Sequence, residues 1–298
     1  MRSIHAPILY ICVAVIAILS GLCFPLATIA SEFIRIPSKS TKNDLPVELL
    51  REVVRRLDNY ELSYPYEEDA NIATKQRQQA DLENDELDII WSSTNPEYET
   101  RFLPIRIPIY RGLLGYRIAL VKKDNIDIFR DVSSLNDLKY FNAGQGLLWA
   151  DTQILRENGI QVTTSNNSAN LFPMLAGDRF DFFPRGINQA WDELDRYSQY
   201  SLAVEPRILL SYRVPTYFFV SISNKKLWQL LNDTLEAMYR DKTFQKLFHE
   251  SPTIKSAINN HNLSSRKLFE LKNTLLSSET PINRKEFWFD PINGEFEI

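Results

Sequence analysis

The stretch LENDELDII, Leu82 to Ile90, returns with changed letters as LAGDRFDFF, Leu175 to Phe183. Both copies begin with Leu, continue with Asn or Gly two residues later, and contain an Asp followed by two apolar residues. We interpret each copy as a helix that ends on a residue tolerant of left-handed geometry, Asn84 or Gly177, followed by a short turn and a buried strand. Two such units predict two α/β lobes. Because this joint is common in α/β proteins, chance similarity is the alternative.

The residues before the first copy predict a β-α-β unit. The segments EFIRIPSK, residues 32–39, and YELSYPY, residues 60–66, are typical of strands. Between them, NDLPVELLREVVRRLDN, residues 43–59, has a polar cap, an early proline and an apolar stripe, which together predict a helix. The stripe consists of Leu49, Leu50, Val53, Val54 and Leu57. This order predicts a mostly parallel sheet flanked by helices, which binds ligands at the carboxyl ends of its strands.

Two segments rich in β-favouring residues predict crossings between the lobes. The first is RFLPIRIPIYRGLLGYRIALVKK, residues 101–123, and ILLSYRVPTYFFVSISN, residues 208–224, mirrors it as a return. Two crossings make the first lobe discontinuous and can act as a hinge. We therefore expect a first lobe at residues 31–118 and 216–298, and a second lobe at residues 119–215.

The C-terminal part is predicted to be mainly helical. LWQLLNDTLEAMYRDKTFQKLF, residues 227–248, has the pattern of one long amphipathic helix. The tail from Ser251 is expected to be helical to about Leu276. RKEFWFDP, residues 284–291, is expected to end as a strand or a packed segment.

The first thirty residues have the pattern of a secretory signal. MRSIH is followed by a run without charge that continues to Ser31, and Thr28 and Ala30 provide small residues at positions that a signal peptidase reads. We expect cleavage after Ala30 and a periplasmic protein. The apolar run is long enough for an uncleaved membrane anchor to remain the alternative.

The cysteine content excludes disulfides as a source of stability, and the net charge narrows the classes of possible partner. Cys12 and Cys23 both lie in the signal segment, so the remaining chain has no disulfide, and Leu22 before Cys23 argues against a lipoprotein anchor. The formal net charge is −4, and loss of Arg2 with the signal makes it one unit more negative. This balance disfavours nucleic acid and anionic membranes as partners. A small solute or a protein fits better.

The residues that enzymes need are sparse. Beyond the signal segment the histidines are His249 and His261, and the nucleophile elbow G-x-S-x-G of hydrolases is absent. Clusters with zinc-ligand spacing are also absent. Glu97 and Glu99 could be paired carboxylates of a glycosidase, but alternate residues of an extended stretch point in opposite directions. The sequence therefore predicts no enzyme, no metal and no cofactor.

The loop QGLLWADTQIL, Gln145 to Leu155, resembles a phosphate loop without having its spacing. After Gly144 and Gly146, Trp149 occupies the place of the third glycine of G-x-G-x-x-G, and a Walker ending is absent. What remains is a helix N-terminus that carries Trp149 and Asp151, where the glycines would bring the backbone close to a solute. In the alternative, the glycines only make a tight turn and Trp149 belongs to the core.

The order of these motifs resembles the type 2 periplasmic solute-binding proteins, especially the amino-acid-binding family called family 3, over nearly the whole chain after the signal. The segments that carry the resemblance are EFIRIPSK, LDIIWSSTNPEYE (87–99), RIPIYRGLLGYRIALV (106–121), FNAGQGLLWADTQIL (141–155), MLAGDRFDFFPRGINQA (174–190) and VPTYFFVSISN (214–224). The resemblance implies a two-lobed fold that closes around a small polar ligand, an amino acid or a related organic ion, and performs no chemistry on it. It also implies a monomer that meets an ABC permease or, alternatively, a membrane sensor. An extracytoplasmic enzyme built on the same lobes is the alternative from another class.

Two departures from the family pattern affect the expected ligand. Family members that bind amino acids read like T-x-T-x-E-R after the strand, and the arginine pairs with the ligand's carboxylate. Here SSTNPEYE has Tyr98 in that place, so Arg101 or Arg106 would have to reach in. In the second lobe the family usually has an aspartate where this chain has Arg185. A ligand with an acidic group near Arg185 and a basic or hydroxyl-bearing part near Asp151 fits these residues better.

Each candidate site residue also has a structural alternative. The hydroxyls of residues 92–94 follow a buried strand and can bind an anion or a polyol, or they can form a plain turn. The fork of Arg185 suits a carboxylate or phosphate, or a salt bridge to a neighbour such as Asp181. Trp149 could stack on a ligand with Tyr110 and Tyr116 opposite, although both tyrosines also suit a core. Asp151 could simply favour the helix dipole. The predicted ligand-binding residues are Ser92, Ser93, Thr94, Arg106, Tyr110, Trp149, Asp151 and Arg185.

Overall fold

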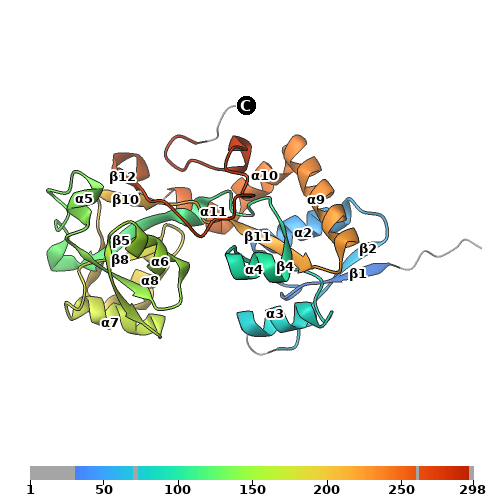
Figure 1. Cartoon of the computed structure of the whole chain (residues 1–298), viewed down its shortest axis with the longest axis horizontal. Coiled ribbons are helices and arrows are strands. Elements are labelled where there is room, and N and C mark those ends of the chain that lie inside the picture. Colours follow the sequence, from blue (N-terminus) through green and yellow to red (C-terminus); the bar gives the residue numbers. More distant parts are fainter. Residues whose placement is uncertain (1–30, 70–72, 260–261, 295–298) are drawn as a thin grey trace, which may run out of the picture.

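The computed structural model describes residues 31–69, 73–259 and 262–294. The predicted signal segment, with Cys12, Cys23 and the expected cleavage point after Ala30, lies outside the described residues, as does His261. Figure 1 shows two α/β bodies side by side, with the C-terminal segment running along one edge of both. Within the described ranges, no helix is long and apolar enough to cross a membrane.

Within the described residues, the first lobe contains five strands and six α-helices, which come from two separate parts of the chain. They are β1 (Glu32–Arg35), α2 (Leu45–Arg55), β2 (Tyr60–Ser63), α3 (Lys75–Glu83), β3 (Ile90–Ser93), α4 (Pro96–Arg101), β4 (Phe102–Ile105), β11 (Thr216–Ser221), α9 (Lys225–Arg240), α10 (Thr243–Glu250) and α11 (Pro252–Asn259).

The second lobe contains seven strands and four helices. They are β5 (Tyr116–Lys122), α5 (Leu135–Leu138), β6 (Asn142–Gly146), α6 (Ala150–Glu157), β7 (Gln161–Ser165), α7 (Leu171–Ala176), β8 (Phe183–Gly186), α8 (Ala190–Arg196), β9 (Leu202–Val204), β10 (Ile208–Ser211) and β12 (Lys267–Glu270).

The sheets are mixed, whereas the sequence predicts mostly parallel ones. The predicted strand, helix and strand at the start of the chain are confirmed, and β1 pairs with β2 in parallel, as β6 does with β7. The crossing strands then enter antiparallel, because β11 pairs with β3 and β4, and β5 pairs with β8, β9 and β10. A crossing that enters a lobe from the opposite side can only run against the strands already there.

The repeated stretches form the same joint in both lobes. α3 ends before the cap residue Asn84 and α7 before Gly177, and each helix is followed by a short turn that leads to the buried strand β3 or β8. The sequence suggests that the cap residue adopts the left-handed conformation. In the structure the aspartate after the cap does so, with φ of 55° at Asp85 and 57° at Asp178. Aspartate tolerates this region because its short polar side chain can form local hydrogen bonds.

A second aspartate of the repeat holds the joint to an earlier strand of its lobe, β1 or β6. The carboxylate of Asp88 accepts the backbone N–H of Arg35 at 2.7 Å, and that of Asp181 accepts the backbone N–H of Asn142 at 2.7 Å. In return the backbone N–H groups of Asp88 and Asp181 donate to the carbonyls of Arg35 and Asn142. The repeat therefore sets the position of β3 beside β1 and of β8 beside β6.

The two crossings lie side by side between the lobes. The N–H of Ile109 donates to the carbonyl of Thr216 at 2.9 Å, and the N–H of Tyr212 donates to that of Gly115 at 3.2 Å. The sequence predicts a fully extended first crossing. In the structure the crossing is interrupted by a turn, because the backbone has positive φ at Arg111 and Gly112. A Cβ on Gly112 would lie 2.6 Å from the ring of Trp288, so only glycine permits this approach.

The C-terminal part differs most from the sequence-based expectation. The predicted long helix is broken at Lys242, whose φ is 67°, and forms α9 and α10 instead. The tail is helical only to Asn259, and residues 267–270 form β12, which pairs in parallel with β10 of the second lobe. RKEFWFDP is a packed segment in which Trp288 is buried. The segment from β12 to Phe289 therefore contacts both lobes.

Candidate functional site

Two glycines of β6, Gly144 and Gly146, leave room for aromatic rings. A Cβ on Gly146 would lie 2.4 Å from the indole of Trp149, and one on Gly144 would lie 2.2 Å from the ring of Phe180. The expectation that these glycines bring the backbone close to a solute is therefore wrong, because side chains of the same lobe fill that space. The predicted strand, loop and helix order is confirmed, with Trp149 as the cap residue of α6.

Trp149 and Arg185 lie together at the end of the second lobe's strands. The Trp149 ring stacks on Phe183 with centroids 6.3 Å apart, and the Arg185 guanidinium lies 5.0 Å from the Trp149 centroid. The same guanidinium donates two hydrogen bonds of 2.6 Å to Glu193. The salt-bridge alternative for Arg185 is thus realised, with Glu193 in place of Asp181. Its fork already holds a carboxylate of this chain.

Asp151 belongs to a buried cluster with two residues that the sequence analysis missed. Its Oδ1 accepts a hydrogen bond of 2.8 Å from Nε of Arg117 and another from the hydroxyl of Tyr212. Burial raises the pKa of Asp151, but the positive charge of Arg117 and the hydrogen bonds outweigh it, so the pKa is lowered overall. Asp151 is therefore an ionised partner of Arg117. The signal for Arg117 in the sequence is its position as the single charge inside the apolar run YRIALV.

The hydroxyl residues predicted in the first lobe lie where β3 ends, and the hydroxyls of Ser93 and Thr94 contact other side chains of the lobe. The Thr94 hydroxyl donates to Glu99 at 2.6 Å, and Glu99 also accepts from Arg106 at 2.9 Å. Arg106 donates to Glu279 as well, at 2.6 Å. Ser92 and Ser93 are half-buried on β3, and Ser93 lies 3.5 Å from the hydroxyl of Thr216.

Tyr110 packs against the main core, as its structural alternative predicts. Burial raises its pKa, and the negative charge of Asp44 raises it further. Asp44 in turn lines a cavity of the first lobe.

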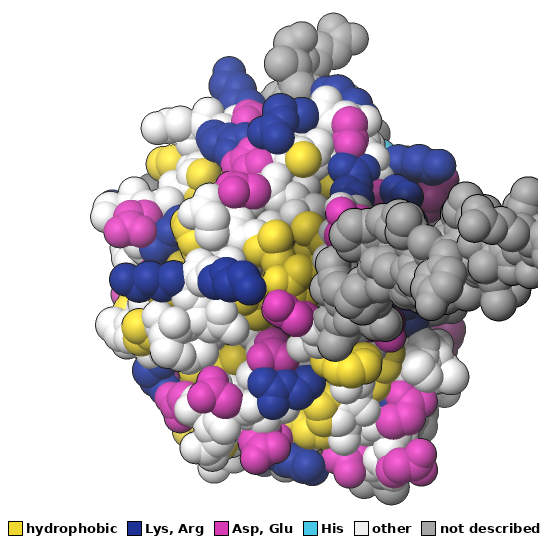
Figure 2. Space-filling model, turned by 90° about the vertical axis from the view of Figure 1, so that its right-hand side faces the viewer, with side chains coloured by type: hydrophobic (Ala, Val, Ile, Leu, Met, Phe, Trp, Pro, Cys, Tyr) yellow, Lys and Arg dark blue, Asp and Glu magenta, His cyan; other side chains and the backbone are white. Residues whose placement is uncertain are grey.

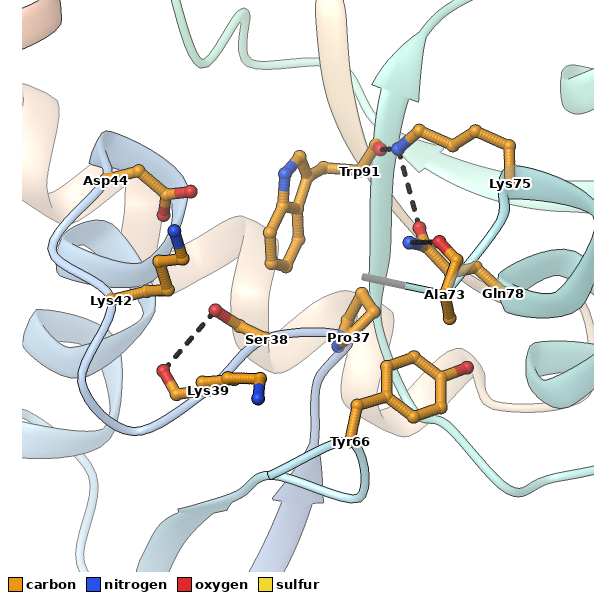
Figure 3. A pocket seen from close by; sticks show the side chains of 10 residues that line it. All are labelled: Pro37, Ser38, Lys39, Lys42, Asp44, Tyr66, Ala73, Lys75, Gln78 and Trp91. Carbon is orange, nitrogen blue, oxygen red and sulfur yellow. Dashed lines mark hydrogen bonds between the residues drawn. The ribbon is translucent and has the colours of Figure 1, made fainter. Parts of the chain in front are cut away.

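This cavity of the first lobe has a volume of about 200 Å³ and was not predicted from the sequence. It lies between the β1–α2 loop, the N-terminus of α3 and the strand β3 (Figure 3). Trp91 projects into it, with Lys42 and Asp44 on one side and Lys75 and Gln78 on the other. The remaining lining residues are Pro37, Ser38, Lys39, Tyr66 and Ala73. Because Trp91 directly precedes Ser92, the cavity adjoins the predicted hydroxyl residues.

A wider groove of about 630 Å³ is lined by residues of both lobes. The first lobe contributes the start of α4, and the second contributes the β6–α6 loop and one face of α6. Trp149 lies in its wall, and the neighbouring Leu148 is 94% exposed. The groove is lined by Asn95, Pro96, Glu97, Leu147, Leu148, Trp149, Ala150, Thr152, Gln153, Arg156, Glu157 and Leu275.

Metal ligands do not gather anywhere in the described part of the chain, where no group of three or more His, Cys, Asp or Glu residues could hold an ion. The chemistry available at the cavity and the groove consists of charge, hydrogen bonding and aromatic contact. Such surfaces suit the binding of a small molecule.

No protein-family model matches the chain, and no curated protein matches it in sequence. Solved structures do match its fold. The probable amino-acid ABC transporter extracellular-binding protein of Bacillus subtilis matches with a TM-score of 0.55 and 16% identity, over 75% of this chain and 98% of that chain. An ancestral arginine-binding protein bound to arginine has a TM-score of 0.50 and 17% identity, over 74% and 98%.

A third structure comes from work on glutathione import through GshT and the cystine ABC importer TcyBC of Streptococcus mutans. It has a TM-score of 0.50 and 17% identity, over 76% of this chain and 99% of that chain. These matches confirm the fold class that the motif order predicts: the chain has the two-lobed α/β fold of the amino-acid-binding proteins of ABC transporters, the type 2 periplasmic-binding fold.

Proposed function

We propose that this protein is an extracytoplasmic solute-binding protein. It captures a small polar solute between its lobes by hinge closure and presents the closed form to a membrane partner, with an ABC permease as the first candidate. The observation that carries the proposal is the groove whose walls come from α4 of one lobe and from the β6–α6 loop of the other. Closure of such a groove would bring Trp149 toward the cavity that contains Trp91.

The hinge in this proposal is the pair of adjacent crossings. We assign the lobes to residues 31–118 with 216–298 and to residues 119–215, except that β12 pairs with the second lobe's sheet. Hinge motion needs a few connecting residues that absorb changes in φ and ψ, and the turn at Gly112 and the short link between β10 and β11 are suitable. A closed form that differs in shape from the open one is what a partner can recognise.

The fold comparisons support a solute-binding role, since the matched proteins carry names of amino-acid binding and ABC import. The identity of the membrane partner and export through the predicted signal are further parts of the proposal. A membrane sensor in place of a permease would use the same closure. Export through the predicted signal, with cleavage after Ala30, belongs to the proposal too.

The proposal can be tested by thermal unfolding of the chain in panels of amino acids, organic acids, polyamines and sugars. A solute that binds only the folded protein stabilises it by about 2.7 kcal/mol at a hundredfold excess over Kd. We expect at least one class to raise Tm, and Trp149→Ala to reduce that rise. If no class raises Tm, or if any tested solute is converted to a product, solute capture without chemistry is contradicted.

A further inference from the structure

The cavity of the first lobe carries more positive than negative charge. Its lining includes Lys39, Lys42 and Lys75 but a single carboxylate, that of Asp44. Among the described residues, none of the three ammonium groups is part of an ion pair. Lys39 donates to the carbonyl of Asp69 at 2.7 Å. A neutral carbonyl fixes an ammonium in place without cancelling its charge.

Lys75 is held toward the cavity in the same way. Its ammonium donates to the carbonyl of Trp91 at 2.8 Å and to Oε1 of Gln78 at 3.4 Å (Figure 3). Although much of the residue is exposed, the ammonium lies among enough protein atoms that desolvation lowers the pKa of Lys75. A partly desolvated cation with only neutral partners gains most from an anion placed beside it.

Two helix N-termini border the same cavity and add to its positive character. Asp44 is the cap residue of α2, and Lys75 is the first residue of α3 after the cap Thr74. The N-terminal end of a helix carries roughly half a positive elementary charge. Asp44 accepts the N–H of Val47, so its carboxylate is used partly within α2.

Aromatic surface forms the rest of the cavity wall. Trp91 is half-buried and packs edge to face on Phe218, with centroids 6.2 Å apart, which fixes the indole plane. Tyr66 is buried below it, beside Pro37. Such walls accept a flat apolar group. The cavity, at about 200 Å³, is smaller than the roughly 300 to 1,000 Å³ of complete ligand sites, so it holds one end of a solute.

The two arginines near the predicted site of the second lobe are both paired with carboxylates. Arg185 is paired with Glu193, and Arg117 with Asp151, at 2.6 and 2.8 Å. On the face of the molecule that Figure 2 shows, basic and acidic side chains are interspersed, so no broad basic area there would attract anions away from the cavity. Arg156, which lines the groove, donates to the carbonyl of Val162, whereas three lysines gather in the first-lobe cavity around one carboxylate.

We propose that this cavity selects an anionic solute, one that places a carboxylate or similar anion among Lys39, Lys42 and Lys75 and a flat group against Trp91. The inference rests on the proposed function of solute capture and adds the charge of the solute to it. It also moves the anion from Arg185, where the sequence pattern suggests it, to the other lobe. Charge complementarity between a site and its ligand is what makes this selection specific.

The inference can be tested by isothermal titration with two matched pairs of probes. Glutamate is compared with glutamine, and benzene-1,3-dicarboxylate with its diamide, because each pair keeps its shape and changes its charge. We expect the anionic member of at least one pair to bind roughly tenfold or more tightly than the neutral member, as expected for a charged hydrogen bond. Raising the salt concentration should weaken the anionic member selectively.

Variants assign the effect to the cavity. Lys42→Gln and Lys75→Gln should each weaken binding of the anionic probe roughly tenfold and leave the neutral probe within about twofold. Lys246→Gln is the matched control, because Lys246 is exposed on α10 and does not line the cavity. Lys42 is itself exposed, so its replacement should leave the thermal stability unchanged.

Each outcome has a defined meaning. The inference is overturned if the neutral probe of each pair binds as tightly as the anionic one, or if the lysine variants behave like Lys246→Gln. It is also overturned if neither pair binds while a neutral or cationic solute of the wider panel raises Tm, in which case solute capture stands. If no solute of any class binds, solute capture and anion selection fail together.

Discussion

The two lobes are built on the same repeated joint, yet they treat charge in opposite ways. In each lobe an aspartate of the repeat, Asp88 or Asp181, accepts a backbone N–H of a strand earlier in the chain. Beyond this joint, the first lobe leaves lysines unpaired around Trp91, whereas the second lobe pairs its Arg185 within its own residues. The joint positions the strand that follows it. The residues near the carboxyl end of that strand decide whether this end can bind a charged group.

The largest expected effect concerns the second lobe's buried pair. Arg117→Met leaves the carboxylate of Asp151 buried without its cation, which should cost about 3–5 kcal/mol of unfolding free energy. Arg185→Met should cost less, about 1–3 kcal/mol, because Arg117 also hydrogen-bonds to the hydroxyl of Tyr212. Urea unfolding followed by circular dichroism measures both. Equal costs would contradict the view that Arg117 contributes more to the stability of the folded protein than Arg185 does.

The next effect compares the two copies of the repeated joint. Asp88→Ala removes the acceptor of the Arg35 N–H and also the partner of the Arg35 guanidinium, so we expect a loss of about 2–3 kcal/mol. Asp181→Ala removes the acceptor of one N–H and should cost about 1–2 kcal/mol. The midpoints of chemical unfolding give the order. A larger loss for Asp181→Ala would contradict a stabilising role for the contact between Asp88 and the Arg35 guanidinium.

A smaller effect tests the fit of Trp149 into its own lobe. Gly146→Ala places a methyl group 2.4 Å from the indole, so the ring must move and the change should cost about 1–2 kcal/mol. The tryptophan emission spectrum should shift as Trp149 becomes more exposed. Unchanged emission with unchanged stability would mean that the glycine is not needed for the ring.

The smallest effect is a pH dependence of the Arg117→Met cost. In the wild type the pKa of Asp151 is lowered, so its contribution to stability is present above the unfolded value of about 3.9 and is lost as the pH falls through the folded pKa. Without Arg117, burial raises that pKa, and this contribution is present at low pH and lost as the pH rises. The cost of Arg117→Met should therefore shrink by about 1 kcal/mol between pH 7 and pH 4. A cost that grows toward low pH would contradict the pairing.

Much of the fold could be predicted because local patterns carry it. The cap at Asp44, the apolar stripe of α2 and the repeated joint each depend on neighbours within a few residues. The break at Lys242 was missed because the apolar pattern continues across it and conceals the turn. β12 was missed since its partner β10 lies far away in the sequence, and pairing between distant strands leaves no periodic signal.

The candidate site was less predictable, because its decisive contacts join distant residues. Trp149, Asp151 and Arg185 do lie at the ends of the second lobe's strands, but their partners could not be read from spacing. Tyr212 is 61 positions from Asp151. The cavity brings residues of three separate segments around Trp91, and none of them forms a motif. The sequence shows which charged residues lie near strand ends, but it does not show which of them are paired with an opposite charge in the fold.

The central claim, capture of a solute between two lobes, is tested most directly by small-angle X-ray scattering of the full chain with and without the pooled solute panel. Closure brings the lobes together, so the radius of gyration should fall when the pool contains a bound solute, and the same fall should be absent in Trp149→Ala at the same concentrations. An unchanged radius of gyration in the presence of the whole pool would contradict the claim.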